Sequence, residues 1–199
     1  MPTVPGPQPD APHAGFRSAH PEGSDAPAAT PGPVLVNWPK DLDWDEFRQV
    51  SSKPENIAEN ATVAPVCISG GKKFHLENGE YRLGDVKFTM KLVRANTWVV
   101  KSARTDELLA HEQGHYDIAG LCNRDMVAEI RQLRNSNKND LVREANRIMI
   151  KHEKNAKDLS ESYDSFLQTD HGHDKRRQKA WQDQITRCRE SGEALTIPP

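Results

Sequence analysis

The chain has 199 residues, with 27 Lys and Arg against 29 Asp and Glu, so its formal net charge is −2. This near-neutral balance argues against a partner recognised mainly by charge, such as nucleic acid or an anionic membrane. The sequence also lacks the run of about 18 apolar residues needed to span a bilayer. Three cysteines are too few for a disulfide framework, and it stays open whether Cys122 or Cys188 forms a bridge. Eight histidines are present, and histidine is the commonest metal ligand among side chains.

Residues 1–33 predict a disordered tail rich in Pro and Ala. They carry few large apolar side chains and cannot bury enough surface to offset the entropy lost on ordering. The stretch has neither a basic start nor a continuous apolar segment, so no signal peptide is recognised and the sequence alone favours a cytoplasmic location. Residues 34–199 are expected to form one domain.

The first part of this domain, residues 34–100, has the pattern of a small twisted β-sheet. Residues 86–93 alternate between apolar and polar side chains, which is typical of a strand with one buried face. An Asn-Gly pair at 78–79 separates two short runs, 73–77 and 80–83, and predicts a tight hairpin.

Two more segments are assigned to the same part of the fold. Residues 62–69 are expected to form another strand. The segment 38–47 precedes it and carries Trp38, Leu42, Trp44 and Phe47, which are expected to pack onto the sheet.

From Thr105 onward the spacing of the apolar residues becomes helical. Thr105 can cap a helix, and apolar or histidine side chains recur every three or four residues over 108–133 and again over 141–166. The polar break between these runs predicts an antiparallel helix pair, and a third helix is expected after a break at 169–174. The fold class is therefore α+β, with a small twisted β-sheet followed by a long helix, an antiparallel second helix and a C-terminal helix.

Residues 111–115 read His-Glu-Gln-Gly-His, an HExxH motif inside the first helix. Positions four apart share one helix face, so His111 and His115 can bind one zinc ion from the same side. Glu112 lies one residue further round, where its carboxylate can reach a zinc-activated water and act as general base. Glycine within a helix costs about 1 kcal/mol relative to alanine, so Gly114 is expected to make room for a close neighbour beside the metal.

A catalytic zinc site needs a third protein ligand and an open position. The metzincin pattern is excluded because Ile118 and Leu121 occupy its Gly and His positions, and no glutamate segment of the thermolysin type follows. From the rise of 1.5 Å per residue, the second helix regains the level of the metal at about residues 159–171. His152 stops short of this level and is expected to lie between the helices.

Four side chains return to the level of the metal and are the candidates for the third ligand: Glu161, Asp164, His171 and His173. The cluster at 169–173, which contains the two histidines, is the favoured source.

The residues around the motif resemble a known family. The run DELLAHEQGHYDIA at 106–119 resembles the bacterial zinc peptidases catalogued as domain of unknown function 922, in which an LLxHEQGHFDIA-like helix follows a Ser/Thr-Trp-Val strand end. Asn-Thr-Trp-Val at 96–99 stands in that place. A downstream Thr-x-His-Gly segment followed by Gln and Trp is similar to residues 169–172 with Gln178 and Trp181.

The resemblance covers roughly residues 38–181 and implies a zincin-like fold, membership of the metallopeptidase superfamily and His171 as the third ligand. The resemblance also implies export or a periplasmic location, whereas the sequence alone, in which no signal peptide is recognised, favours the cytoplasm. By the same resemblance, residues 96–100 are expected to be an edge strand that pairs with an extended substrate.

These observations predict a zinc-dependent hydrolase, specifically a metalloprotease that cleaves peptide bonds. Zn²⁺ is assigned to His111, His115 and His171, and Glu112 is the general base. The expected partner is a peptide or protein substrate, and the chain is expected to be monomeric. The alternatives are a non-catalytic zinc-containing binding or effector module, and a helical scaffold whose histidines belong to the core.

Further roles are assigned to polar residues near the motif. Tyr163 is the first candidate for donating a hydrogen bond to the oxyanion, with Tyr116 and His173 as the others. Asp117 and Asp170 are candidates for holding the free ring nitrogens of the ligand histidines.

Overall fold

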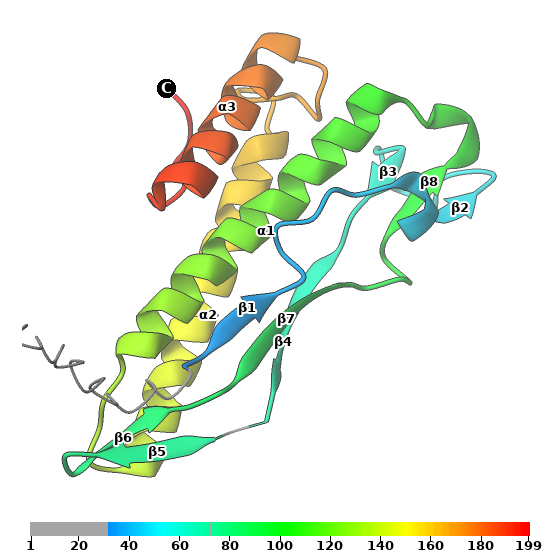
Figure 1. Cartoon of the computed structure of the whole chain (residues 1–199). Helices are drawn as coiled ribbons and strands as arrows, with labels where there is room; N and C mark the ends of the chain where they lie inside the picture. The colour runs from blue at the N-terminus through cyan, green and yellow to red at the C-terminus, as the bar shows by residue number, and fades with distance from the viewer. Residues whose placement is uncertain (1–31, 72) are drawn as a thin grey trace, which may run out of the picture.

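The computed structural model describes residues 32–71 and 73–199, in which short strands precede three long helices (Figure 1). The strands are β1 (Val34–Val36), β2 (Arg48–Val50), β3 (Ala61–Thr62), β4 (Pro65–Gly70), β5 (Phe74–Glu77), β6 (Glu80–Leu83), β7 (Lys87–Leu92) and β8 (Trp98–Val100). The helices are α1 (Asp106–Gln132), α2 (Lys138–Asp164) and α3 (Lys175–Ser191), with two single 3₁₀ turns, η1 (Trp44–Glu46) and η2 (Lys101–Ala103). The tail expected at 1–33 falls almost entirely outside the described residues.

The three helices begin at side-chain caps that the sequence provides. Thr105 accepts a hydrogen bond from the backbone N–H of Leu108 at the start of α1, and Asn137 and Asp174 cap α2 and α3 in the same way. Gly192 ends α3 in the left-handed conformation, with φ of 78°. The predicted layout of a long helix, an antiparallel second helix and a C-terminal helix is confirmed (Figure 1).

The strands form three small sheets rather than the single sheet that was expected. Their orders are β1-β7-β4, β2-β8-β3 and β5-β6. The predicted hairpin is confirmed, since β5 and β6 pair antiparallel around residues 78–79. The strand predicted at 62–69 is divided between β3 and β4, which belong to different sheets. Proline has no N–H for a ladder and starts a strand more readily than it continues one, and Pro65 begins β4.

The expectation that residues 96–100 form an edge strand is wrong. β8 pairs with β2 on one side and with β3 on the other, so it is the central strand of its sheet. All three of its residues are buried, and Val99 has no exposed surface. The edge of this sheet that lies near the helices is β3.

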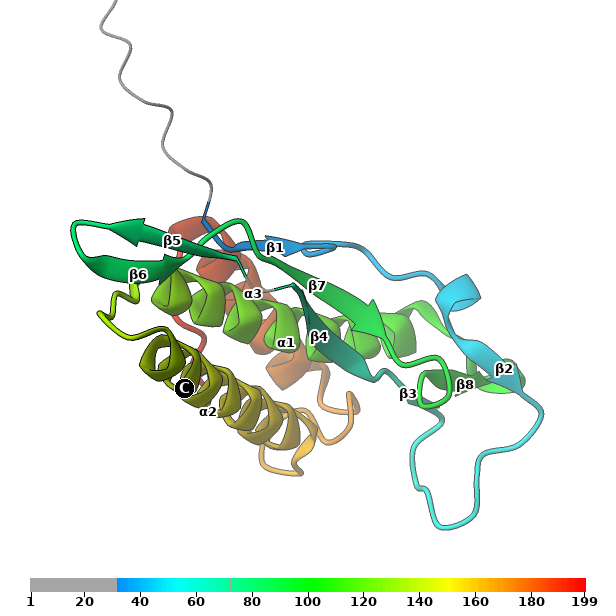
Figure 2. The ribbon, with the colours of Figure 1, turned by 90° about the horizontal axis from the view of Figure 1, so that it is seen from below.

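Helix α1 is the central element of the fold. The strands lie along one side of it, and α2 and α3 pack on the others (Figure 2). One core cluster joins the three helices through Ile118, Leu159, Tyr163 and Trp181. The segment expected at 38–47 packs as predicted, with Leu42 and Phe47 buried together with residues of α1 and β8.

His152 and the three cysteines lie away from the motif. His152 of α2 lies 2.8 Å from the Glu129 carboxylate of α1, so it bridges the helices as expected. Cys67, Cys122 and Cys188 are all free thiols. None of the helices in the described ranges has the length and apolar character required to cross a membrane.

Candidate metal centre

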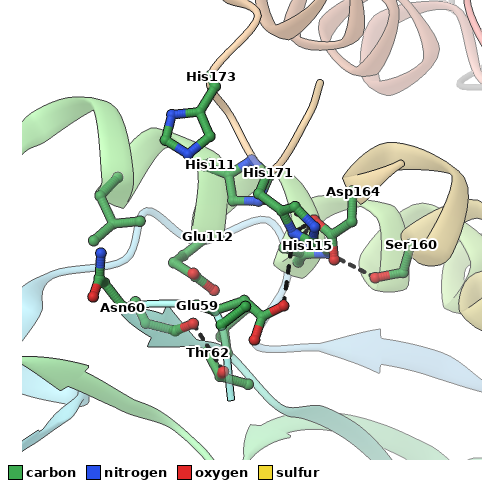
Figure 3. A pocket seen from close by; sticks show the side chains of 14 residues that line it. Glu59, Asn60, Thr62, His111, Glu112, His115, Ser160, Asp164, His171 and His173 are labelled. Atoms are coloured by element: carbon green, nitrogen blue, oxygen red, sulfur yellow. Dashed lines mark hydrogen bonds and ion pairs between the residues drawn. The ribbon is translucent and has the colours of Figure 1, made fainter. Parts of the chain in front are cut away.

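The HExxH motif occupies the middle of α1, and its two histidines point to the same carboxylate. His111 Nε2 lies 3.0 Å and His115 Nε2 lies 2.9 Å from Asp164 Oδ1. Within the described residues, these three side chains form the group whose ligand atoms lie close enough together, within 4.8 Å, to hold one metal ion. Figure 3 shows them converging, with Glu112 beside them.

Asp164 reaches the histidines because it is the last residue of α2. This helix runs back antiparallel to α1 and ends at the level of the motif, as the rise per residue predicts. Asp164 was one of the four candidates for the third ligand. Glu161, another of them, lies on an exposed face and pairs with Lys157 at 3.6 Å, away from the histidines.

The electrostatics of the group favour a cation. Burial alone would raise the pKa of Asp164, but its hydrogen bonds with His111 and His115 hold that pKa below its ordinary value. For His111 the effect of burial is the opposite and would lower its pKa, but hydrogen bonds with Asp164 and Gln178 hold that pKa above its ordinary value. An ionised carboxylate and two imidazoles together form a ligand set suited to zinc. Tetrahedral zinc ligands at 2.0–2.1 Å lie about 3.3 Å from one another, which is close to the two separations between Asp164 and the histidines.

The other ring nitrogen of each histidine, Nδ1, also has a hydrogen-bond partner. His111 Nδ1 lies 3.1 Å from Gln178 Oε1, and His115 Nδ1 lies 2.6 Å from Ser160 Oγ. The Gln178 amide nitrogen donates to the Tyr163 hydroxyl, so the amide oxygen is the atom left to accept from His111. With the proton on Nδ1, the Nε2 lone pair of His111 points to the site of the metal.

The predicted roles of Asp117 and Asp170 in holding these nitrogens are not supported, because Gln178 and Ser160 occupy the positions. Asp117 instead accepts hydrogen bonds from Trp38 and Gln113 on another face of α1. Gln178 was noted only as part of the family resemblance. No sequence pattern indicated a role for Ser160, although it lies one helical turn before Asp164 on the same face of α2.

Tyr163 lies behind the histidines. It is fully buried, and its ring stacks on His111 with centroids 4.7 Å apart and an interplanar angle of 11°. Its hydroxyl donates to the His111 carbonyl at 3.3 Å, and it is absent from the residues that line the cavity. Gly114 faces this ring, so the expectation that Gly114 makes room for a close neighbour is confirmed. Tyr116 is buried in another core cluster and also lies outside the cavity.

The open side of the group faces a cavity of about 420 Å³, and Glu112 lines it next to the histidines. Only 4% of Glu112 is exposed, and burial raises its pKa, although His115 and His111 pull the other way. The segment 58–63, which includes β3, forms the opposite wall. A buried carboxylate beside a candidate metal site is the arrangement expected of a general base.

His171 and His173 lie at the mouth of this cavity, on the turn that follows α2 (Figure 3). His171 Nδ1 is 3.9 Å from Asp164 Oδ1 and 3.8 Å from Glu59 Oε1, and 45% of its side chain is exposed. It does not belong to the group of three, although its backbone is held close by left-handed residues at 170–172. The assignment of His171 as a ligand stays a prediction. Glu59 was not identified from the sequence.

Comparison with known proteins finds a family that matches this region of the chain. Residues 75–172 match the family described as "Bacterial protein of unknown function (DUF922)", which supports the assignment made from the motif. The match includes the whole HExxH helix and α2, and it ends within the turn that carries His171. No curated protein and no solved structure matches the chain.

Proposed function

We propose that the chain is a zinc-dependent peptidase in which His111, His115 and Asp164 hold the metal and Glu112 is the general base. The observation that carries the proposal is the convergence of two imidazoles and one carboxylate on a cavity that also contains a buried glutamate. The family match gives no activity, so the argument rests on these residues.

Zinc held at this group would lower the pKa of water to about 7 and polarise a carbonyl oxygen. The chain supplies the proton transfers. Glu112 takes the proton from the attacking water and gives it to the leaving amine, and a pKa raised by burial suits this exchange near neutral pH. Gln178 keeps the His111 imidazole in the required tautomer, and Ser160 orients the His115 ring.

A peptide substrate fits the wall opposite Glu112. β3 pairs with β8 on one side only, and residues 58–63 around it line the cavity. An extended peptide can therefore add to the free edge of β3 through backbone hydrogen bonds. β3 takes the place that the sequence assigned to residues 96–100. His171 and His173 are exposed side chains of the cavity that can donate to a developing oxyanion, whereas Tyr163 acts through the position of His111.

Zinc stoichiometry tests the ligand assignment. We expect one zinc per chain after metal-free preparation and reconstitution, loss of zinc in Asp164→Ala and in His111→Ala, and retention in His171→Ala. Loss of tight zinc in His171→Ala with retention in Asp164→Ala would instead make His171 the third ligand. A wild-type chain that takes up no zinc overturns the proposal.

Hydrolysis is tested separately. Glu112→Gln is expected to keep the metal and to lose cleavage of a broad peptide library that the wild-type chain cleaves. Full zinc occupancy of the wild-type chain without cleavage of any library member would favour the non-catalytic binding module.

A further inference from the structure

A second cavity, of about 310 Å³, adjoins the candidate metal centre. Val63, His115 and Ser160 line both cavities, so the two are successive parts of one groove. The segment from residue 58 to residue 67 forms one wall of this groove, and α2 forms the other. A chain that followed this groove across the candidate metal centre would bring a side chain up to the second cavity, which we call the side chamber.

The side chamber is lined mainly by apolar groups. Ala119 and Met126 of α1 contribute to it, as do Met149 and Ala156 of α2, and the residues of each pair lie about two helical turns apart. Cys67 contributes from β4, and burial raises the pKa of its thiol to about 11, so the thiol is uncharged at neutral pH. A neutral thiol and two thioethers are adaptable apolar surfaces that accept different side-chain shapes.

Most polar side chains around the chamber have partners of their own, and its charged residues Glu153 and Lys157 are both exposed. Asn123 donates to the carbonyl of Ala119, His152 pairs with Glu129, and Lys157 pairs with Glu161. None of these pairs leaves a buried charge aimed into the chamber. A charged ligand group seated among the apolar side chains of the chamber would lose its hydration, which is costly, whereas an apolar group would gain contacts there.

The outer wall of the chamber is an edge strand. β4 pairs with β7 on one side and is the edge of its sheet, and Pro65, Val66 and Cys67 of this strand face the chamber. β3, the preceding strand, is likewise an edge and lines the first cavity. An extended chain laid along this wall would follow the groove from one cavity to the other.

We infer that the side chamber is a specificity subsite that receives a large uncharged side chain, such as Leu, Met or Phe, from the residue next to the scissile bond. This inference rests on the proposed peptidase function, because the chamber selects among substrates only if a chain is bound at the metal centre. Hydrophobic pockets discriminate by about 10- to 200-fold in kcat/KM for small differences in side-chain size.

Filling the chamber tests this inference in the zinc-loaded full chain. Wild type is expected to cleave peptides with Leu at the selected position at least 10-fold better in kcat/KM than peptides with Gly there. Ala156→Phe fills the chamber and should remove most of that preference while zinc content stays at the wild-type value. Ala128→Phe places the same ring on an exposed position of α1 outside the chamber and should leave the preference unchanged.

Binding of peptide hydroxamates separates this inference from the peptidase proposal, because it needs zinc but no cleavage. A leucyl hydroxamate should bind wild type at least 10-fold more tightly than a glycyl hydroxamate, and Ala156→Phe should equalise the two. This result without peptide cleavage would support the chamber and overturn the peptidase. Equal binding of the two hydroxamates to wild type, or cleavage without side-chain preference, overturns the chamber. Met149→Ala, which enlarges the chamber, is the second variant and should shift preference toward bulkier side chains.

Discussion

Gly114 gives the Tyr163 side chain the space it occupies against α1. A Cβ at position 114 would overlap the Tyr163 hydroxyl and ring. The same ring stacks on His111 and meets His115 edge-on, with centroids 4.9 Å apart. Because the ring touches both histidines, the lack of a side chain at Gly114 lets α2 approach the candidate metal centre this closely.

Gly114→Ala is therefore expected to destabilise the fold and weaken zinc binding together. Overpacking a core costs about 1–3 kcal/mol, while alanine returns about 1 kcal/mol of helix propensity. Urea denaturation measures the free energy of unfolding, and competition with a chelating dye measures zinc affinity. Adding Tyr163→Phe removes the overlapping hydroxyl and should recover part of both losses. If Gly114→Ala alone binds zinc with wild-type affinity, the contact between residue 114 and Tyr163 has no effect on the site.

The local pattern of the chain predicted most of the elements but not how the strands are assembled. Residues 108–133 and the Asn-Gly pair at 78–79 carry signals within a few residues, and both elements form as expected. β3 and β4 follow one another in the sequence yet pair in different sheets. β8 is central because β2, fifty residues earlier, pairs with it. Such long-range pairing leaves no local periodicity to detect.

The candidate metal centre was predictable where helical geometry fixes positions. The spacing of His111 and His115 and the return level of α2 follow from the rise and turn of a helix, and both are found. The choice between Asp164 and His171 depends on where α2 ends. Ser165 caps it, and the following turn places His171 at the mouth of the cavity. No periodicity encodes the conformation of that turn.

Gln178→Ala is predicted to lower zinc affinity without unfolding the chain. The amide oxygen of Gln178 accepts from His111 Nδ1, and loss of such an outer partner costs about 10- to 100-fold in metal affinity. Lys179→Ala removes the neighbouring exposed side chain of α3 and is the matched control. Equal zinc affinities of the two variants would contradict the role given to Gln178.

Ser160→Ala is predicted to act at the other histidine in the same direction. Ser160 Oγ lies 2.6 Å from His115 Nδ1 and fixes the orientation of that ring. Removing an outer partner weakens metal binding by about 10- to 100-fold. For Ser160→Ala we expect a loss of zinc affinity at the lower end of this range, because water can enter the half-buried position. Ser162→Ala, which removes a hydroxyl bonded only to the Asp158 carbonyl of its own helix, should leave zinc affinity unchanged. The prediction fails if both serine variants bind zinc like wild type.

Gly172→Ala is predicted to cost more stability than Gly192→Ala. Both glycines are left-handed, with φ of 82° and 78°, so each alanine carries a backbone cost of about 1–2 kcal/mol. At Gly172 the new Cβ would also lie 3.1 Å from the His111 ring, whereas nothing lies within 4 Å of a Cβ at Gly192. The difference in unfolding free energy isolates the contact with His111. Zinc affinity should fall only in Gly172→Ala, and equal results for the two variants would count against that contact.

Removal of the metal is predicted to lower the melting temperature while leaving the chain folded. Without an ion, Asp164 still bonds to both histidines, and the helices remain joined by the buried cluster around Leu159 and Trp181. Free zinc at 100 times Kd stabilises the folded chain by about 2.7 kcal/mol, and at about 2–4 °C per kcal/mol this gives a difference of about 5–11 °C. Differential scanning calorimetry with and without EDTA measures it. Asp164→Ala should melt at the same temperature in both buffers. A wild-type melting temperature unaffected by EDTA would favour the helical scaffold whose histidines are core residues.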